Sequence, residues 1–123
     1  MIGEDPDRVH PKRLTLIVPA VKCTLDPVPE EIAAGVVGKV EDEMCKLFGG
    51  CTTYAAKGKW IDPRGRTHQE DVFIVESYAT YPAFVAGQVQ FKDLTNRVGR
   101  WLVQEKVAFT IDGTLYMERV EHS

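Results

Sequence analysis

Long hydrophobic runs are absent from this 123-residue sequence. No stretch approaches the roughly 18 apolar residues that a membrane-spanning helix needs, and the polar, acidic start of the chain lacks the pattern of a signal peptide. We therefore expect a cytoplasmic protein with no membrane partner. Charge of one sign is also scarce, because the formal net charge is only −3. This balance gives no general attraction to polyanions, so no nucleic-acid partner is expected.

Cysteine and histidine are scarce as well, with three of each. Cys23, Cys45 and Cys51 leave one cysteine unpaired in any disulfide scheme, and their spacing matches neither a redox nor a zinc motif. We expect reduced thiols, with Cys45 in the core and Cys51 accessible beside a glycine turn. The histidines follow no metal-ligand spacing. The sequence therefore predicts neither a metal site nor a cofactor.

The length and composition are those of one globular domain, with 44% hydrophobic and 27% charged residues. Residues 1–12 contain acids and prolines without periodicity, and we interpret them as a flexible N-terminal arm. Residues 13–120 form the expected single domain. Within it there is no internal repeat, low-complexity tract or linker.

Apolar periodicity predicts five strands and two helices. Pro29 and Pro82 suit the first turn of a helix, and Thr80 can cap the second helix. Gly49 supplies the left-handed residue that ends the first helix. The expected strands cover residues 14–18, 52–61, 69–78, 107–111 and 114–120, and the helices begin near 29 and 82. The order β-α-β-β-α-β with an added C-terminal hairpin strand predicts an α+β, ferredoxin-like fold: an antiparallel sheet with two helices on one face.

The sheet face without helices is expected to be apolar at its centre. Leu14, Leu16 and Val18 point to one side and Ile17 to the other, while residues 72–75 are apolar at every position. Exposing such side chains costs roughly 25 cal/mol per Å². We therefore predict a homodimer in which a second copy covers the open sheet face. The alternative is that the last strand or the N-terminal arm folds over it.

Glu76 is the best candidate for acid–base chemistry. It follows the apolar run 72–75 on a predicted central strand, and burial there would raise the pKa of a carboxyl group. Tyr78 shares its face, and Tyr54 lies on the neighbouring strand. These three residues are the catalytic candidates. The ordinary alternative is that Glu76 lies at the solvated end of its strand.

Trp60, Gly58 and Glu70 are the candidates for ligand binding. Gly58 and Trp60 share one face of their strand, and the absence of a side chain at Gly58 could leave room for a ligand. Glu70 lies on the partner strand of the hairpin. The ordinary alternative is that Trp60 fills the core.

A longer pattern surrounds these candidates. It comprises Leu47-Phe48-Gly49-Gly50, then Thr52 or Thr53, Gly58-Lys59-Trp60, Asp62, Gly65 and Glu70. The pattern resembles small uncharacterised bacterial α+β proteins of a domain-of-unknown-function type, found in many genomes and on mobile elements. The likeness covers roughly residues 45–78. It implies a ferredoxin-like fold and carries no assigned catalytic residues.

Two classes of function remain open. The apolar sheet face and the lack of a recognised catalytic constellation favour a dimeric, non-catalytic module that binds a small molecule or a protein. The alternative is a small dimeric enzyme in which a partly buried glutamate shuttles protons on an apolar substrate. The sequence leaves the question of enzyme activity undecided and leans toward the module.

Overall fold

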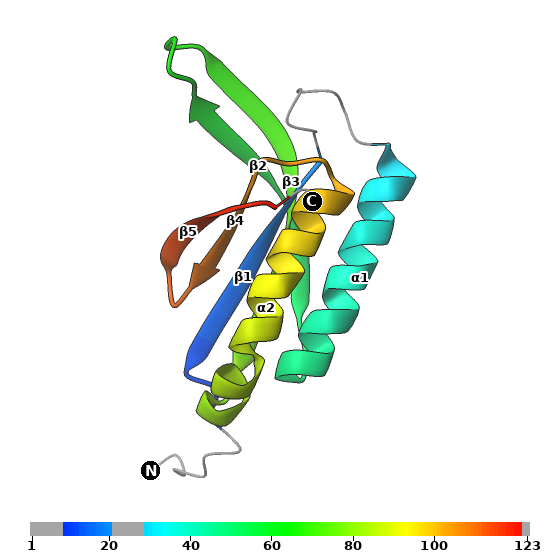
Figure 1. Ribbon diagram of the computed structural model, residues 1–123, viewed down its shortest axis with the longest axis vertical. Coiled ribbons are helices and arrows are strands. Elements are labelled where there is room, and N and C mark those ends of the chain that lie inside the picture. Colours follow the sequence, from blue (N-terminus) through cyan, green and yellow to red (C-terminus); the bar gives the residue numbers. More distant parts are fainter. Residues whose placement is uncertain (1–8, 21–28, 122–123) are drawn as a thin grey trace.

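The computed structural model describes residues 9–20 and 29–121 of the chain (Figure 1). Residues 1–8 of the expected N-terminal arm lie outside this part, and Lys12 of that arm already belongs to the first strand. The elements are β1 (Lys12–Pro19), α1 (Glu30–Phe48), β2 (Thr52–Ile61), β3 (Thr67–Ala79), α2 (Tyr81–Trp101), β4 (Lys106–Ile111) and β5 (Thr114–Arg119). Neither helix is long and apolar enough to cross a membrane within the described residues.

The five strands form one antiparallel sheet in the order β2-β3-β1-β4-β5. Both helices cover the same face of this sheet, as Figure 1 shows. The predicted ferredoxin-like α+β fold is therefore confirmed, with β5 as the additional edge strand. β1 lies between β3 and β4, so it is shielded by a strand on each side and by helices on one face.

Local chemistry explains where the helices begin and end. The Thr80 hydroxyl accepts a hydrogen bond from the backbone N–H of Ala83 at 3.3 Å and so caps α2. Gly49 has a φ of 94°, and its N–H donates to the carbonyl of Cys45 at the end of α1. Pro29 was expected at the first position of α1. It is instead the N-cap residue, immediately before the helix begins at Glu30.

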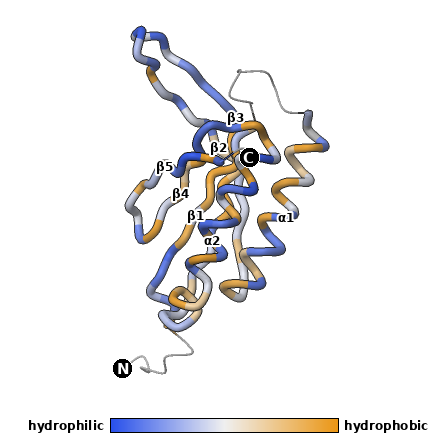
Figure 2. The backbone as a smooth tube through the Cα atoms, in the orientation of Figure 1, coloured by the Kyte–Doolittle hydropathy of each residue, from blue (hydrophilic) through white to orange (hydrophobic). Residues whose placement is uncertain are grey.

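The core lies between the helices and the sheet. Phe91 of α2 is fully buried and contacts the rings of Phe48 and Phe109 edge-on, with centroids 6.1 Å and 5.4 Å apart. Leu14 and Leu16 of β1 are also fully buried beneath the helices. Figure 2 shows the far end of the β2–β3 hairpin as mainly hydrophilic, in contrast to β1. The hairpin thus extends beyond the apolar part of the molecule.

The open sheet face is less exposed at its centre than the sequence suggests. Val72 points to this face but is only 6% exposed, and Ile17 and Ile74 are half-buried. The exposed apolar side chains lie on the outer strands instead, among them Tyr54 on β2 and Met117 on β5. The apolar surface therefore forms two flanks around a partly sheltered centre.

Gly99 is the position where α2 approaches the C-terminal segment most closely. A Cβ atom there would lie 2.8 Å from Cγ1 of Val120 and closer still to Cγ2. Val120 is branched and buried, so it cannot swing aside. Gly35 of α1 is a matched control, because nothing lies within 4 Å of the Cβ it would carry.

We expect Gly99→Ala to lower the free energy of unfolding by up to about 2 kcal/mol, since overpacking costs about 1–3 kcal/mol and the higher helix propensity of alanine offsets about 1 kcal/mol of that cost. Gly35→Ala should raise the free energy of unfolding by up to about 1 kcal/mol. Urea unfolding at one protein concentration measures both. Equal effects of the two substitutions would contradict the close contact at Gly99.

Candidate functional site

The predicted site residues share the helix-free face of the sheet but form two groups. Glu76 pairs across the sheet with Thr52 on one side and Thr15 on the other, whereas Trp60 pairs with His68. Eight residues separate His68 from Glu76, which is about 25 Å along a strand. Trp60 therefore cannot act at the same site as Glu76.

A polar row crosses four strands around Glu76. Thr52 of β2, Glu76 of β3, Thr15 of β1 and Thr110 of β4 are neighbours in the strand register. The hydroxyls of Thr15 and Thr110 are hydrogen-bonded to each other, and Thr15 is buried. The row therefore offers hydroxyl groups and a carboxylate beside the apolar side chains of this face.

An ion pair joins Arg13 to Glu76 within this polar row. Nη2 and Nε of Arg13 lie 2.7 Å and 2.8 Å from the same carboxylate oxygen, Oε2 of Glu76. The hydrogen bond and the charge of Glu76 raise the pKa of Arg13. The Glu76 side chain is only 11% exposed. The expectation of a carboxyl group surrounded by apolar residues is thus corrected: Glu76 is a sheltered anion with a cationic partner.

Tyr78 and Tyr54 flank the polar row on opposite sides. Tyr78 pairs with Arg13 across β3 and β1, and Tyr54 pairs with Ile74 across β2 and β3. Both tyrosines are exposed. The structure therefore brings the three catalytic candidates together on one face. The rings of the two tyrosines are accessible to a ligand there.

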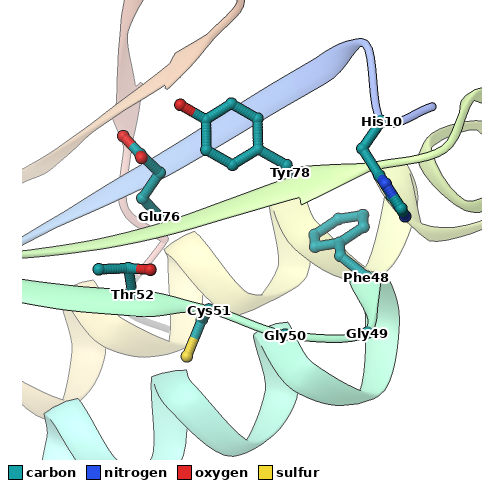
Figure 3. Close-up of a pocket in the computed structure, with 8 residues that line it drawn as sticks. All are labelled: His10, Phe48, Gly49, Gly50, Cys51, Thr52, Glu76 and Tyr78. Carbon is teal, nitrogen blue, oxygen red and sulfur yellow. The ribbon is translucent and has the colours of Figure 1, made fainter. Parts of the chain in front are cut away.

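A cavity of about 290 Å³ adjoins this group, where α1 ends and β2 begins. Figure 3 shows Glu76 and Tyr78 projecting from β3 on one side of the sheet, with the Phe48–Thr52 segment along the edge. The hydroxyl of Ser77 donates to the carbonyl of Gly50 at 2.6 Å and holds this segment against β3. The cavity is lined by His10, Phe48, Gly49, Gly50, Cys51, Thr52, Glu76 and Tyr78. Its volume lies at the lower end of the range for small-molecule sites, about 300–1,000 Å³.

Glu70 and Gly58 form a separate group. Burial raises the pKa of the Glu70 carboxyl. A Cβ on Gly58 would lie 3.5 Å from Cγ of Glu70. The space above Gly58 is therefore occupied by the Glu70 side chain and not by an open ligand site.

Trp60 lies on the hairpin and not in the core. Its ring stacks on His68 with centroids 4.2 Å apart, and Nε2 of His68 is 2.8 Å from Oδ2 of Asp62. The alternative that Trp60 fills the core is wrong, because the ring is exposed. A ligand-binding role of Trp60 stays a prediction. Its structural role is to support the hairpin turn.

Sequence reasoning missed Arg13, Thr15 and Thr110 as members of the site. A signal for Thr15 exists, because it interrupts the apolar run 14–18 at a position that points away from the helices. Arg13 and Thr110 carry no such signal. Within residues 9–20 and 29–121, no group of three or more His, Cys, Asp and Glu side chains could hold a metal ion.

The fold is similar to that of a class of small enzymes. The structure of a phage SAM lyase in complex with S-methyl-5′-thioadenosine matches with a TM-score of 0.61 and 16% identity, over 89% of both chains. The phage SAM lyase in the apo state matches with a TM-score of 0.58 and 14% identity, over 91% of both chains. At this identity the likeness shows the fold alone. No protein-family model and no curated protein matches the chain, so the resemblance to bacterial domains of unknown function stays a prediction.

These similar structures correct the functional expectation from the sequence. The chain was expected to be a non-catalytic binding module, yet the two solved structures above, which share its fold over about nine-tenths of its length, are structures of an enzyme. The apolar sheet face alone therefore does not indicate a module. The alternative expectation, a small ferredoxin-like enzyme, agrees better with these structures.

The raised pKa of Glu70 predicts how stability depends on pH. A folded-state pKa above the ordinary value of 4.5 means that the unfolded chain releases this proton first. The protonated Glu70 carboxyl therefore favours the folded state below pH 4.5. This contribution to the free energy of unfolding is lost as the pH rises through the pKa of Glu70 in the folded protein. Glu70→Gln should therefore gain stability relative to the native chain with rising pH, by less than about 1 kcal/mol because Glu70 is only half-buried.

Urea unfolding of Glu70→Gln and the native chain between pH 4 and pH 8 tests this expectation. Glu105→Gln is the control, because Glu105 is exposed. A difference between native chain and Glu70→Gln that does not change with pH would contradict the burial of the Glu70 carboxyl.

Proposed function

We propose that this chain is a cytoplasmic enzyme that cleaves S-adenosylmethionine, or a closely similar sulfonium nucleoside, and releases S-methyl-5′-thioadenosine. The observation that carries the proposal is the likeness of fold, over 89% of both chains, to a phage SAM lyase bound to S-methyl-5′-thioadenosine. The match also covers equal shares of the two chains, so it includes both helices and the sheet. The Arg13–Glu76 pair on the helix-free face supplies a site with suitable charges.

The proposed reaction defines what a site must recognise. In S-methyl-5′-thioadenosine the sulfur keeps its methyl and adenosyl groups, so the bond that breaks joins sulfur to the amino-acid side chain. The bonding electrons go to sulfur, which loses its positive charge. In the proposed reaction the carboxylate oxygen of the same substrate forms the new bond to the carbon that sulfur leaves, so the amino-acid part is released as a five-membered lactone. The leaving group is a neutral thioether and needs no proton from an acid. The substrate itself carries a sulfonium, an ammonium and a carboxylate group.

The polar row has partners for each of these groups. We assign Glu76 to the substrate ammonium and Arg13 to the substrate carboxylate, since charge-assisted hydrogen bonds are the strongest polar contacts available. The rings of Tyr54 and Tyr78 can contact the sulfonium cation through their faces. Glu76 thus has a binding role and not the role of proton shuttle, because the thioether leaves unprotonated.

A second copy of the chain would complete this site. The tyrosines that flank the polar row are exposed in the single chain, and further apolar side chains are exposed on β5. We propose that a homodimer forms through the open sheet face and shields the substrate from water. The same contact would bury the apolar flanks of the sheet.

Glu76→Gln is the direct test of the site. We expect a loss of at least about tenfold in kcat/KM for S-adenosylmethionine, because removing one charge-assisted contact costs roughly 1.5–3 kcal/mol. The assay follows S-methyl-5′-thioadenosine by liquid chromatography and mass spectrometry. Glu43→Gln is a matched control, since Glu43 also lies near an arginine, Arg97 at 3.8 Å, but on the helices.

Two results would count against the proposal. A native chain that releases no S-methyl-5′-thioadenosine from millimolar S-adenosylmethionine would overturn the proposed reaction. A Glu76→Gln variant as active as Glu43→Gln would keep the reaction and overturn the assignment of the site.

The homodimer makes a separate prediction. Met117 on the open face is 58% exposed and Val89 on the helical side is 74% exposed. Met117→Lys should weaken self-association at least about tenfold, because it places an ammonium group in the proposed apolar contact. Val89→Lys should leave association unchanged. Sedimentation velocity at tens of micromolar measures both, and a native chain that stays monomeric would exclude the homodimer.

A further inference from the structure

Two thiols meet at the end of α1. The Sγ atoms of Cys45 and Cys51 are 3.7 Å apart, although the residues lie on opposite sides of the Gly49–Gly50 turn. Their exposure is the reverse of the sequence expectation: Cys45 is exposed and Cys51 is half-buried. Cys45 is therefore the sulfur that a reagent in solution meets first.

The surroundings of Cys51 keep it protonated near neutral pH. Burial, followed by the hydrogen bond with Cys45, raises the pKa of Cys51 to about 11. The Cys51 sulfur also lies 3.9 Å from the carbonyl oxygen of Glu41, which holds it near Cys45. A disulfide bond is about 2.05 Å long, so the two sulfurs need to approach by about 1.6 Å.

We propose that Cys45 and Cys51 are a modification site, forming a reversible disulfide by exchange with a low-molecular-weight disulfide of the glutathione type. This inference is independent of the proposed enzyme activity. It rests on the sulfur separation, the exposure of Cys45 and the short, glycine-containing turn between the two residues. The turn matters because Gly49 and Gly50 carry no side chains that would resist a small backbone adjustment.

The exchange proceeds in two balanced steps. The thiolate of Cys45 attacks one sulfur of the glutathione disulfide, forming a mixed disulfide and releasing one glutathione thiolate. The sulfur of Cys51, on losing its proton, attacks the Cys45 sulfur of the mixed disulfide and releases the second glutathione thiolate. The two protein thiol protons end on the two glutathione molecules. The protein is oxidised by two electrons and the disulfide reagent is reduced by two.

Formation of the disulfide would constrain one wall of the cavity of about 290 Å³ that adjoins Glu76. Cys51 lines this cavity together with Phe48, Gly49 and Gly50. Closing the Cys45–Cys51 bond links this wall covalently to the last turn of α1. The modification would therefore restrict the motion of the Phe48–Thr52 segment relative to the helix.

Intact mass spectrometry of the full chain tests the proposal. The protein is equilibrated with reduced and oxidised glutathione in fixed ratios, quenched with acid and labelled with N-ethylmaleimide under denaturing conditions. We expect a species two hydrogen masses lighter, unlabelled at Cys45 and Cys51, that dithiothreitol returns to the labelled form. A Cys23→Ser background removes the third thiol, which lies outside the described residues.

The single variants supply the controls. Cys51→Ser should stop at a stable glutathione adduct on Cys45, because the second sulfur is missing. Cys45→Ser should react at least about tenfold more slowly with glutathione disulfide than Cys51→Ser, because the remaining thiol is half-buried. A native chain that accumulates the glutathione adduct on Cys45 without closing, or that stays unmodified, would overturn the proposal.

The pH dependence of labelling gives an independent check. Only the thiolate reacts, so a raised pKa shifts the rise in rate to higher pH. The site-resolved rate of alkylation at Cys51 should increase about tenfold per pH unit and continue to rise through pH 10. A rate that levels off near pH 9 would contradict the sheltered state of Cys51.

Discussion

The placement of both helices on one face of the sheet is the constraint on which the rest of the molecule depends. It requires the strands beneath the helices to send alternate side chains into the helical core and to the opposite face. β1 meets this requirement with Leu14 and Leu16 on the core side and Thr15 between them on the other. The core is thus completed on one side, and the opposite side is free to carry polar groups.

On that free side, electrostatics organises the surface. The Glu76 side chain is only 11% exposed, and the ion pair with Arg13 offsets part of the cost of removing a carboxylate from water. The ion pair and the threonine hydroxyls form a polar strip between apolar flanks.

Periodicity and turn chemistry predicted most of the fold. The strand 52–61 and the first-helix end at Gly49 are observed as expected, and Thr80 caps α2. Such signals depend on residues only a few positions apart, so they can be recognised in a single sequence. The ion pair of Glu76 was not predicted, because its partner Arg13 is 63 residues away along the chain and lies beside it only across the sheet.

The sequence by itself determined the type and order of the elements, their approximate bounds and which face of a strand each side chain occupies, since these follow from local geometry with periods of 2 and 3.6 residues. Only the tertiary structure decided which of those side chains meet. The Thr15–Thr110 contact, the Arg13–Glu76 pair and the separation of Trp60 from Glu76 all depend on strand register. Register is set by the packing of the whole sheet against its helices, which no short stretch of sequence encodes.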